Sequence, residues 1–287
     1  MLDEGGNHSV SLLCDVLRVS RSGFYEWKNR VESAHTKWRQ KIGDLIEAFF
    51  DASEQTYGYR RIHADLLDNG VQIDDDTVRK IMRERTLTPC QPGPKRLVTT
   101  IAADAGDLPD LVQRDFTAEA PGSKLCGDIT YIKTWEGWLF LATVLDCFSK
   151  KVVGYAMSDR MTSGLVVAAL DKAARNVPFI PDVTVFHSDR GSQYMSADFA
   201  ICARKYGVRR SVGRTGVCYD NAWAESFNGT LKNECVNRKQ YPTRERAIKD
   251  ITRYIELRYN SRRRHSALDY STPNRVESEW FCRNIAA

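Results

Sequence analysis

The stretch that decides the fold is CGDITYIKTWEGWLFLATVLD, residues 126–146. Two runs rich in β-branched and aromatic residues, 126–135 and 138–146, are separated by a Glu-Gly pair, a pattern typical of a β-hairpin. A third run, KKVVGYAM (150–157), follows after another short turn. The pattern therefore predicts three adjacent strands in an antiparallel meander.

Helical and extended patterns alternate after this meander. The apolar spacing predicts a helix over 162–175, a strand over 183–187, a helix over 196–206, a strand over 208–212 and a helix over 221–235. The order β-β-β-α-β-α-β-α predicts a mixed sheet with helices packed on it, an α/β layered architecture.

Two acidic residues fall where this sheet can bring them together. Asp128 lies inside an otherwise apolar strand, which is costly unless the charge is paired, liganded or at an open end of the sheet. Asp189 ends the fourth strand, in VFHSDRGSQY (185–194), and ligand crevices in open α/β sheets form at strand ends. By itself, an acid at a strand end is more often an ordinary loop carboxylate than a member of a site, so the interpretation of Asp189 depends on whether other acids can reach it. A parallel pairing of the two strands would place Asp189 beside Asp128.

A third acid lies in the predicted helix of YDNAWAESFNGTLKNE (219–234), where Asp220 is placed to cap the first turn. Glu225 and Lys232 lie on one stripe, because seven residues advance almost two full turns. The core face of this helix carries Trp223, Phe227 and Leu231, and the opposite side carries Asn221, Glu225, Asn228 and Lys232.

Three carboxylates that converge on one point repel one another, and a bound divalent cation would offset this repulsion. Mg²⁺ takes few protein carboxylates and leaves positions for phosphate oxygens and water. Two such ions, about 3.5–4 Å apart, can activate a nucleophile and stabilise the leaving oxygen of a phosphodiester. Asp128, Asp189 and Glu225 are therefore candidate metal ligands, and Lys232 is a candidate contact to the phosphate backbone.

Other polar residues near these acids admit two interpretations. Asp146, which closes the second strand, is the competing acid, and its alternative role is in a turn. His187 is better explained as a polar residue at a strand end than as a metal ligand. Asn221 and Asn228 are candidates for DNA contacts or for support of the ligands, and Arg190 is a further candidate DNA contact.

The N-terminal part of the chain is helical. Residues 9–30 predict a helix-turn-helix with Ser20 as an N-cap, although an ordinary helical hairpin has the same outline. An amphipathic helix over 36–52 precedes a second helix-turn-helix-like segment, 57–87, whose basic residues face either solvent or phosphates. The DNA-contact candidates here are Arg21, Arg60, Arg61 and Arg79.

Proline-rich sequence marks a domain boundary. TPCQPGPKRLVTT (88–100) has three prolines within six residues, which breaks the helical pattern. We expect a helix-turn-helix segment over 1–30, a helical DNA-binding domain over 36–95, a linker over 96–117 and a catalytic domain over 118–280.

The C-terminal region of the catalytic domain, from about residue 238, is basic. Residues 238–265 contain ten Lys and Arg against three acids, with tyrosines interleaved. Such a stretch can follow a phosphate backbone with salt-sensitive affinity, or it can be a solvated helix face. The candidate DNA contacts are Arg262, Arg263 and Arg264.

The bulk composition narrows the class of protein. The chain has 287 residues, a net charge of +5 and 42% hydrophobic residues, enough for a packed core. We find neither an apolar run as long as a membrane span nor a signal peptide. The eight cysteines form no CxxC pair, which favours reduced thiols in a cytosolic protein over a structural zinc site.

The motifs in combination resemble a known family. GDITYI, HSDRGSQY and YDNAWAESFNGTLKNE together resemble the DDE catalytic core of retroviral-integrase-like transposases. The last two acids are 225 − 189 = 36 positions apart, which is typical of that group, and Lys232 matches its basic residue. YIELRYNSRRRHSALDYSTPNRVE, VSRSGFYEW and YGYRRI resemble segments of the second-reading-frame protein of the insertion-sequence-3 family. The resemblance covers nearly the whole chain, with Leu125 where the family often has Trp.

The resemblance implies an RNase H-like fold with Asp128, Asp189 and Glu225 as ligands of Mg²⁺ or Mn²⁺, with two ions expected. It implies a transposase that cuts DNA at the ends of its element and joins the freed 3′-hydroxyl to another phosphodiester. The alternatives are an RNase H-type nuclease and a catalytically inactive, transposase-derived regulator.

The resemblance also implies partners and a location. We expect terminal inverted repeats and target DNA as partners, a homo-oligomer on DNA, and a fusion with, or dependence on, the product of an upstream reading frame. The expected location is the bacterial cytoplasm, in association with the nucleoid and not with a membrane.

Overall fold

The computed structural model describes residues 9–90, 108–213 and 221–285. The chain divides into a helical unit, residues 1–88, and a catalytic unit, residues 89–287. Asp220, predicted to cap a helix, lies outside the described residues, as does the first part of the predicted linker. In the described part of the chain, no helix has the length and apolar character needed to cross a membrane.

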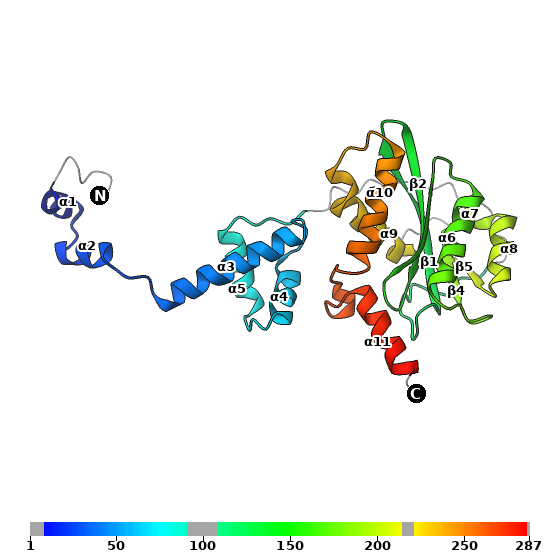
Figure 1. Ribbon diagram of the computed structural model, residues 1–287, viewed down its shortest axis with the longest axis horizontal. Coiled ribbons are helices and arrows are strands. Elements are labelled where there is room, and N and C mark those ends of the chain that lie inside the picture. Colours follow the sequence, from blue (N-terminus) through cyan, green and yellow to red (C-terminus); the bar gives the residue numbers. More distant parts are fainter. Residues whose placement is uncertain (1–8, 91–107, 214–220, 286–287) are drawn as a thin grey trace. The chain divides into compact units, whose positions relative to one another are not determined.

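The helical unit confirms the predicted N-terminal helices (Figure 1). The Ser20 hydroxyl accepts a hydrogen bond from the Gly23 N–H at 3.0 Å, so Ser20 is the N-cap that was predicted. Asp74 is a second N-cap, because its carboxylate accepts from the Thr77 N–H at 2.8 Å. The helices are α1 (Val10–Leu17), α2 (Arg21–Lys28), α3 (Ala34–Ala52), α4 (Tyr59–Asp68) and α5 (Asp75–Glu84).

One hydrophobic core joins the last three of these helices. Helices α3, α4 and α5 bury Ile46, Ile62, Leu66 and Val78 against one another, each almost fully excluded from solvent. Burial of apolar side chains at this spacing is what stabilises short helices, because isolated helices of this length are marginal in water.

The catalytic unit contains a five-stranded sheet in the order β3-β2-β1-β4-β5. The predicted meander is present, since β1 pairs with β2 and β2 with β3 in antiparallel fashion. β4 pairs with β1 in parallel, and β5 pairs with β4 in parallel, as a mixed sheet requires. The strands are β1 (Lys124–Thr134), β2 (Gly137–Asp146), β3 (Val152–Ser158), β4 (Val185–Ser188) and β5 (Arg209–Val212).

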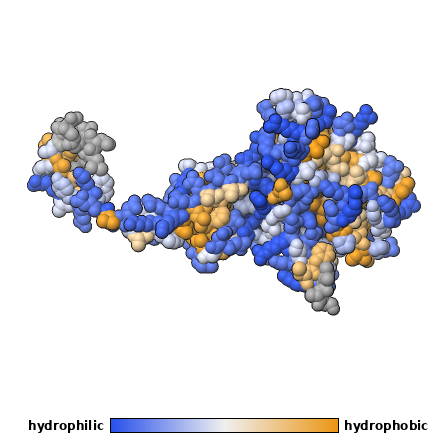
Figure 2. Space-filling model, viewed as in Figure 1, coloured by the Kyte–Doolittle hydropathy of each residue, from blue (hydrophilic) through white to orange (hydrophobic). Residues whose placement is uncertain are grey.

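Helices cover both faces of this sheet, as Figure 1 shows. One face carries α6 (Ser163–Asn176), α7 (Ser192–Met195) and α8 (Ala197–Lys205), and the other carries α9 (Ala222–Glu234) and α10 (Arg244–Arg253). The single helix predicted over 196–206 is preceded by α7 and separated from it by Ser196, whose hydroxyl accepts from the Phe199 N–H and caps α8. Hydrophilic residues cover most of the visible face, with hydrophobic residues in separate patches (Figure 2).

The chain after α9 packs back onto the sheet. It runs through η2 (Val236–Arg238), α10, the π-helical turn η3 (Tyr254–Tyr259), η4 (Ser266–Leu268) and α11 (Pro273–Ile285). The Asn260 side chain accepts from the Val152 N–H and donates to the Val152 carbonyl, both at 3.0 Å, so it satisfies the main chain of the edge strand β3. This contact attaches the C-terminal segment to the sheet.

The opposite edge of the sheet is covered by residues that were predicted to form a linker. The Val212 N–H donates to the Pro109 carbonyl at 3.2 Å, and the Leu111 N–H donates to the Ser211 hydroxyl at 2.8 Å. The described end of the predicted linker therefore packs on β5 as part of the catalytic unit.

Candidate active site

Asp128 and Asp189 lie side by side because their strands are parallel. Cys126 on β1 is paired with His187 on β4, so two further residues along each strand bring the two acids level with one another. The aromatic ring of Phe186 packs directly over Gly127, where an added Cβ would lie 2.3 Å from the ring. A side chain at position 127 would separate the strands, so this glycine sets the close approach of the two acids.

Each of these carboxylates is held by nearby donors. Asp128 accepts from the Ile129 N–H at 2.8 Å and, through its other oxygen, from the Asn228 side-chain amide at 2.8 Å. Asp189 accepts from the Gly191 N–H at 2.9 Å. These bonds fix the orientation of both carboxylates before any ligand is present.

The electrostatics of the pair favour a cation. Burial raises the pKa of Asp128 to about 7, and the charges of Asp189 and, to a smaller extent, Glu225 add to this shift. Burial also raises the pKa of Asp189. A divalent cation would oppose these pKa shifts, because it favours the charged form of every carboxylate around it.

Glu225 lies near the two aspartates but does not join them in a closed cluster. It is on the first turn of α9 and is exposed, although its charge reaches Asp128. Within residues 9–90, 108–213 and 221–285, no three His, Cys, Asp or Glu side chains are grouped closely enough to hold a metal ion. The described structure therefore brings together two of the three predicted ligands, with the third beside them.

Buried polar atoms without partners surround Asp128. Thr143 is the cross-strand partner of Asp128, and the charges of Asp128 and Asp189 raise the pKa of Tyr194 beyond the effect of its burial. Such atoms are normally satisfied by ordered water or a ligand. Those that lack a hydrogen bond here are Thr143 Oγ1, Tyr194 Oη, Asn221 Oδ1 and Asn228 Oδ1. Together with the carboxylates, they make a site that fits a hydrated divalent cation.

Two asparagines attach α9 to β1. The Asn221 amide donates to the Gly127 carbonyl at 3.0 Å, and the Asn228 amide donates to Asp128. Both side chains are 7% exposed. Of the two interpretations kept open for them, this geometry favours support of the site over direct contact with DNA.

Lys232 lies over the aromatic ring of Tyr131 and within reach of the charge of Asp128. Its ammonium nitrogen is 4.8 Å from the ring centroid, and burial lowers its pKa while the charge of Asp128 partly opposes that effect. The predicted stripe of Glu225 and Lys232 on one side of α9 therefore lies along the site.

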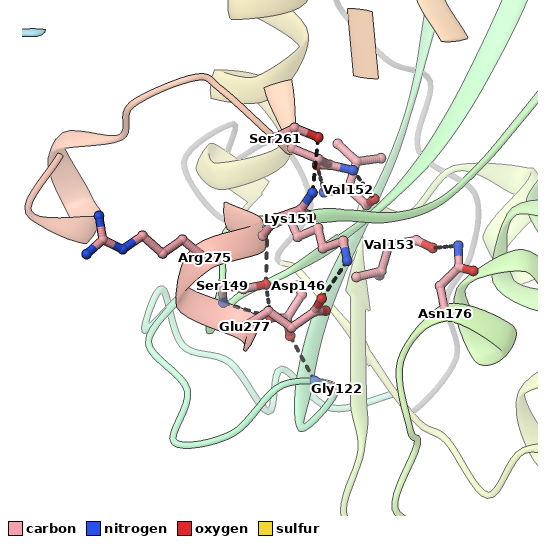
Figure 3. Close-up of polar contacts among 12 residues, drawn as sticks. Gly122, Asp146, Ser149, Lys151, Val152, Val153, Asn176, Ser261, Arg275 and Glu277 are labelled. Carbon is pink, nitrogen blue, oxygen red and sulfur yellow. Dashed lines mark hydrogen bonds and ion pairs between the residues drawn. The ribbon is translucent and has the colours of Figure 1, made fainter. Parts of the chain in front are cut away.

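Asp146, the competing acid, is engaged in a turn. One of its carboxylate oxygens accepts from the Gly122 N–H at 2.9 Å, and the other accepts from the N–H and hydroxyl of Ser149 at 2.7 and 2.6 Å (Figure 3). The residue is fully buried, and burial raises its pKa. These bonds account for Asp146 as a structural residue.

His187 is also buried, with its Nδ1 2.9 Å from the Ser211 hydroxyl. This contact fits the expected role at a strand end. Arg190 donates to the Gly213 carbonyl at 2.9 Å, next to the site.

The remaining predicted DNA contacts fall into three environments. Arg21 and Arg60 are exposed, while Arg79 is exposed beside Asp76 at 3.8 Å. Arg61 lies over the Tyr57 ring, and Arg264 donates to the Tyr270 carbonyl. Arg262 is exposed.

Arg263 does not fit the prediction of a DNA contact. Its side chain is 7% exposed and forms an ion pair with buried Glu234 at 2.8 Å, so it stabilises the fold and does not face solvent. Sequence spacing alone could not separate it from its neighbours, because all three lie in one run of arginines.

Two residues of the site were missed in the sequence. Thr143 is the partner of Asp128 in the hairpin register, and counting outward from the Glu-Gly turn would have found it. Tyr194 lies in α7, five residues after Asp189, and in the sequence only its closeness to Asp189 pointed to the site.

Family models match most of the chain. Two models, each described as an integrase core domain, match residues 118–218 and 206–273. A third, described as an HTH-like domain, matches residues 37–95.

Similar proteins align along nearly the full length. "Transposase InsF for insertion sequence IS3A" of Escherichia coli (strain K12) is 37% identical over 282 residues, which cover 94% of this chain and 94% of that protein. The "Insertion element IS600 uncharacterized 31 kDa protein" of Shigella sonnei is 37% identical over 261 residues, which cover 91% of this chain and 96% of that protein. Among solved structures, the HTLV-2 integrase catalytic core domain in complex with magnesium (dimeric form) has 19% identity and a TM-score of 0.41, covering 55% of this chain and 97% of that one.

Proposed function

The chain belongs to the insertion-sequence-3 family of transposases, and from this premise we propose how its site cuts and joins DNA. It is a DNA transposase of the DDE type with an RNase H-like integrase core. The observation that carries the proposal is the placement of Asp128 beside Asp189 at the open end of two parallel strands.

Asp128, Asp189 and Glu225 would hold the divalent metal on which the integrase core depends, and we propose Mg²⁺ or Mn²⁺, as two ions. When bound, such ions activate the attacking hydroxyl and stabilise the leaving oxygen of the phosphodiester. The carboxylates of Asp128 and Asp189 are already oriented by backbone and amide donors, which supports their assignment as ligands. Glu225, on the exposed first turn of α9, is the ligand that closes the set.

The chain's own groups position the reacting strand. Asn228 keeps one Asp128 oxygen in a fixed direction, and Asn221 holds the start of α9 against β1. Lys232 carries a positive charge beside the acids and binds the phosphate backbone that enters the site. These fixed groups supply the in-line geometry on which phosphoryl transfer depends.

DNA is the partner of both units. The HTH-like domain supports DNA binding by the helical unit, and we propose that it recognises the terminal inverted repeats of the element. The exposed residues Arg21, Arg60 and Arg79 are the proposed contacts in this unit. In the basic segment 238–265, Arg262 and Arg264 are the proposed contacts to flanking or target DNA.

Transposition brings two element ends together, so we propose a homo-oligomer on DNA. We further propose that the chain acts with, or fused to, the product of an upstream reading frame. Nucleoid association would follow from DNA binding. A domain division of 1–30, 36–95, 96–117 and 118–280 remains our proposal, with the residues after Pro109 assigned to the catalytic unit.

A strand-transfer assay with pre-cut element ends tests this function. We expect joined product with Mg²⁺ or Mn²⁺, and none in EDTA. Asp189→Asn should bind the ends as the wild-type chain does but neither cut nor join them, because the site loses a charged ligand. Cleavage without joined product would identify a hydrolytic nuclease, and end binding without either reaction would identify a regulator.

A further inference from the structure

The hairpin of β1 and β2 extends beyond its neighbours in the sheet. β4 pairs with β1 only as far as Cys126, and β3 pairs with β2 only from Phe140 onward. Residues 132–139 therefore form a two-stranded ribbon at the end of the sheet at which Asp128 lies, and Thr130 and Tyr131 lie where this ribbon begins.

The two faces of this ribbon differ. Thr130, Ile132, Thr134 and Leu139 point to one face and are buried. The other face, which we call the aromatic face, carries Tyr131, Lys133 and Trp138. Tyr131 and Trp138 are 40% and 49% exposed, with ring centroids 5.1 Å apart at an angle of 81°. Large aromatic side chains paired on an exposed surface indicate a binding site more often than scattered single ones do.

Two lysines belong to the aromatic face. Lys133 is directly opposite Trp138 in the strand register, and the ammonium of Lys232 lies over the Tyr131 ring at 4.8 Å. Neither lysine belongs to an ion pair within the part of the chain that the structure describes. Lys232 lies one turn of α9 after Asn228, which donates to Asp128, so its ammonium joins the Tyr131 ring to the neighbourhood of the acids. Asp128 itself shares the buried face of β1 with Thr130 and Ile132, so the entering strand would pass from the aromatic face around the edge of β1 to the carboxylates.

We propose that the aromatic face binds an unpaired segment of the DNA strand that enters the active site, with a base stacked on Tyr131 or Trp138 and phosphates on Lys133 and Lys232. Bases of an intact duplex are already stacked on one another, so aromatic platforms of this kind take single strands. The negative backbone complements the two lysines. This inference rests on the proposed function, since it supplies a site for the end of the reacting strand.

The consequence concerns the DNA end itself. A terminal base that leaves its complement and stacks on the aromatic face would keep the strand beside Asp128 while the next phosphate reaches the carboxylates. Ends with unpaired terminal nucleotides are therefore the preferred substrates, because the cost of opening the duplex has been removed.

Fluorescence titration of the full chain in EDTA tests this site without any catalytic step. The probes are a short single-stranded oligonucleotide with 2-aminopurine at its end and the same strand in a fully paired duplex. We expect quenching of the single strand, and a loss of affinity of roughly tenfold or more in Trp138→Ala and in Tyr131→Ala. Trp138→Phe should retain most of the affinity, because it keeps an aromatic surface.

Trp135→Ala is the matched control. Trp135 is 72% exposed in the turn of the same hairpin, outside the Tyr131–Trp138 pair. Equal affinities of Trp138→Ala and Trp135→Ala would overturn the proposal. The proposal would also be overturned if Trp138→Ala changed the oligomeric state, measured by ultracentrifugation, and left the affinity for the oligonucleotide unchanged. The aromatic face would then bind protein.

The result of the oligonucleotide titration can be distinguished from the result of the strand-transfer assay that tests the proposed function. Absence of quenching by a wild-type chain that joins pre-cut ends normally would overturn only the aromatic face. Stacking that depends on Trp138 in a chain that joins no ends would support the aromatic face and contradict the transposase mechanism.

Discussion

At the scale of single residues, the site is built from charges that the fold buries at a cost. Asp128 and Asp189 are adjacent carboxylates, and their neighbours Asn228, Thr143 and Tyr194 leave polar atoms unsatisfied. Each buried charge and each unsatisfied polar atom lowers the free energy of unfolding unless a ligand pairs with it. A site that is unfavourable when empty binds a cation more tightly, because the cation relieves repulsion that already exists.

This cost predicts that Asp128→Asn stabilises the metal-free protein. The pKa of Asp128 is raised to about 7 in the folded state, so the folded state holds this proton more tightly than the unfolded state does. The free energy of unfolding therefore falls as the pH rises from about 4 to about 7 and stays low above that. At pH 8 the substitution should raise the Tm by roughly 2–4 °C for each 1 kcal/mol relieved. At pH 5 the gain should be smaller.

Asp146→Asn is the control for that measurement. Its carboxylate accepts from Gly122 and Ser149, and an amide nitrogen there would face donors, so the Tm should fall. At position 128 the same conflict is avoided, because the Asn228 amide can turn its unsatisfied oxygen toward the new donor. A lower Tm for Asp128→Asn at both pH values would contradict this account.

At the scale of elements, the C-terminal segment is part of the catalytic unit. Tyr254, Ile255 and Tyr259 of the π-helical turn lie in the same core as β1, β2 and α9. The Tyr254 hydroxyl donates to Glu234 at the end of α9, and Arg263 closes an ion pair with the same carboxylate. The helix that carries Glu225 and Lys232 is thus fixed at its C-terminal end by residues 20 and 29 positions after Glu234.

Arg263→Met should destabilise the protein by about 3–5 kcal/mol, because it leaves Glu234 charged and buried without its partner. Urea unfolding measures the change. The double variant Glu234→Leu with Arg263→Met should recover much of the loss, because no unpaired charge remains. Arg253→Ala, which removes an exposed partner of Asp250, should change stability by about 0.5 kcal/mol or less. Equal stability of the single and double variants would contradict the role of the pair.

The sequence predicted local elements better than distant contacts. Periodicity located β1, β2 and β4, and the placement of Asp128 beside Asp189 followed from one assumption, a parallel pairing that the structure confirms. The role of Arg263 depended on a partner 29 positions away, which no local pattern could identify. The exposure of Glu225 was equally hidden, because a helical stripe gives direction around the axis but not distance from β1.

At the scale of the whole molecule, the chain combines a helical unit with a catalytic unit. The first has its own core around Ile46, Ile62 and Leu66, and the second has cores on both faces of its sheet. Separate cores allow recognition of the element ends and chemistry at the phosphodiester to be changed independently.

Arg60→Ala should therefore weaken binding to element ends without changing the joining rate at saturating DNA. Arg60 is exposed beside the Tyr59 ring, in the match to the HTH-like domain. Loss of one phosphate contact reduces the slope of log affinity against log salt by about 1. Anisotropy titrations from low to high salt, with a scrambled duplex as the comparison, measure both effects. An unchanged slope would remove Arg60 from the interface.

The central claim is that Asp128, Asp189 and Glu225 act as one site, and Glu225 is the exposed member of the three. The most direct measurement is the yield of joined product from pre-cut ends with Glu225→Gln, beside Ser226→Ala as an exposed neighbour on α9. DNA binding of both variants is measured in EDTA. The account predicts equal binding, normal joining by Ser226→Ala, and joining by Glu225→Gln reduced by at least about a hundredfold. Joining by Glu225→Gln at the wild-type rate would contradict it.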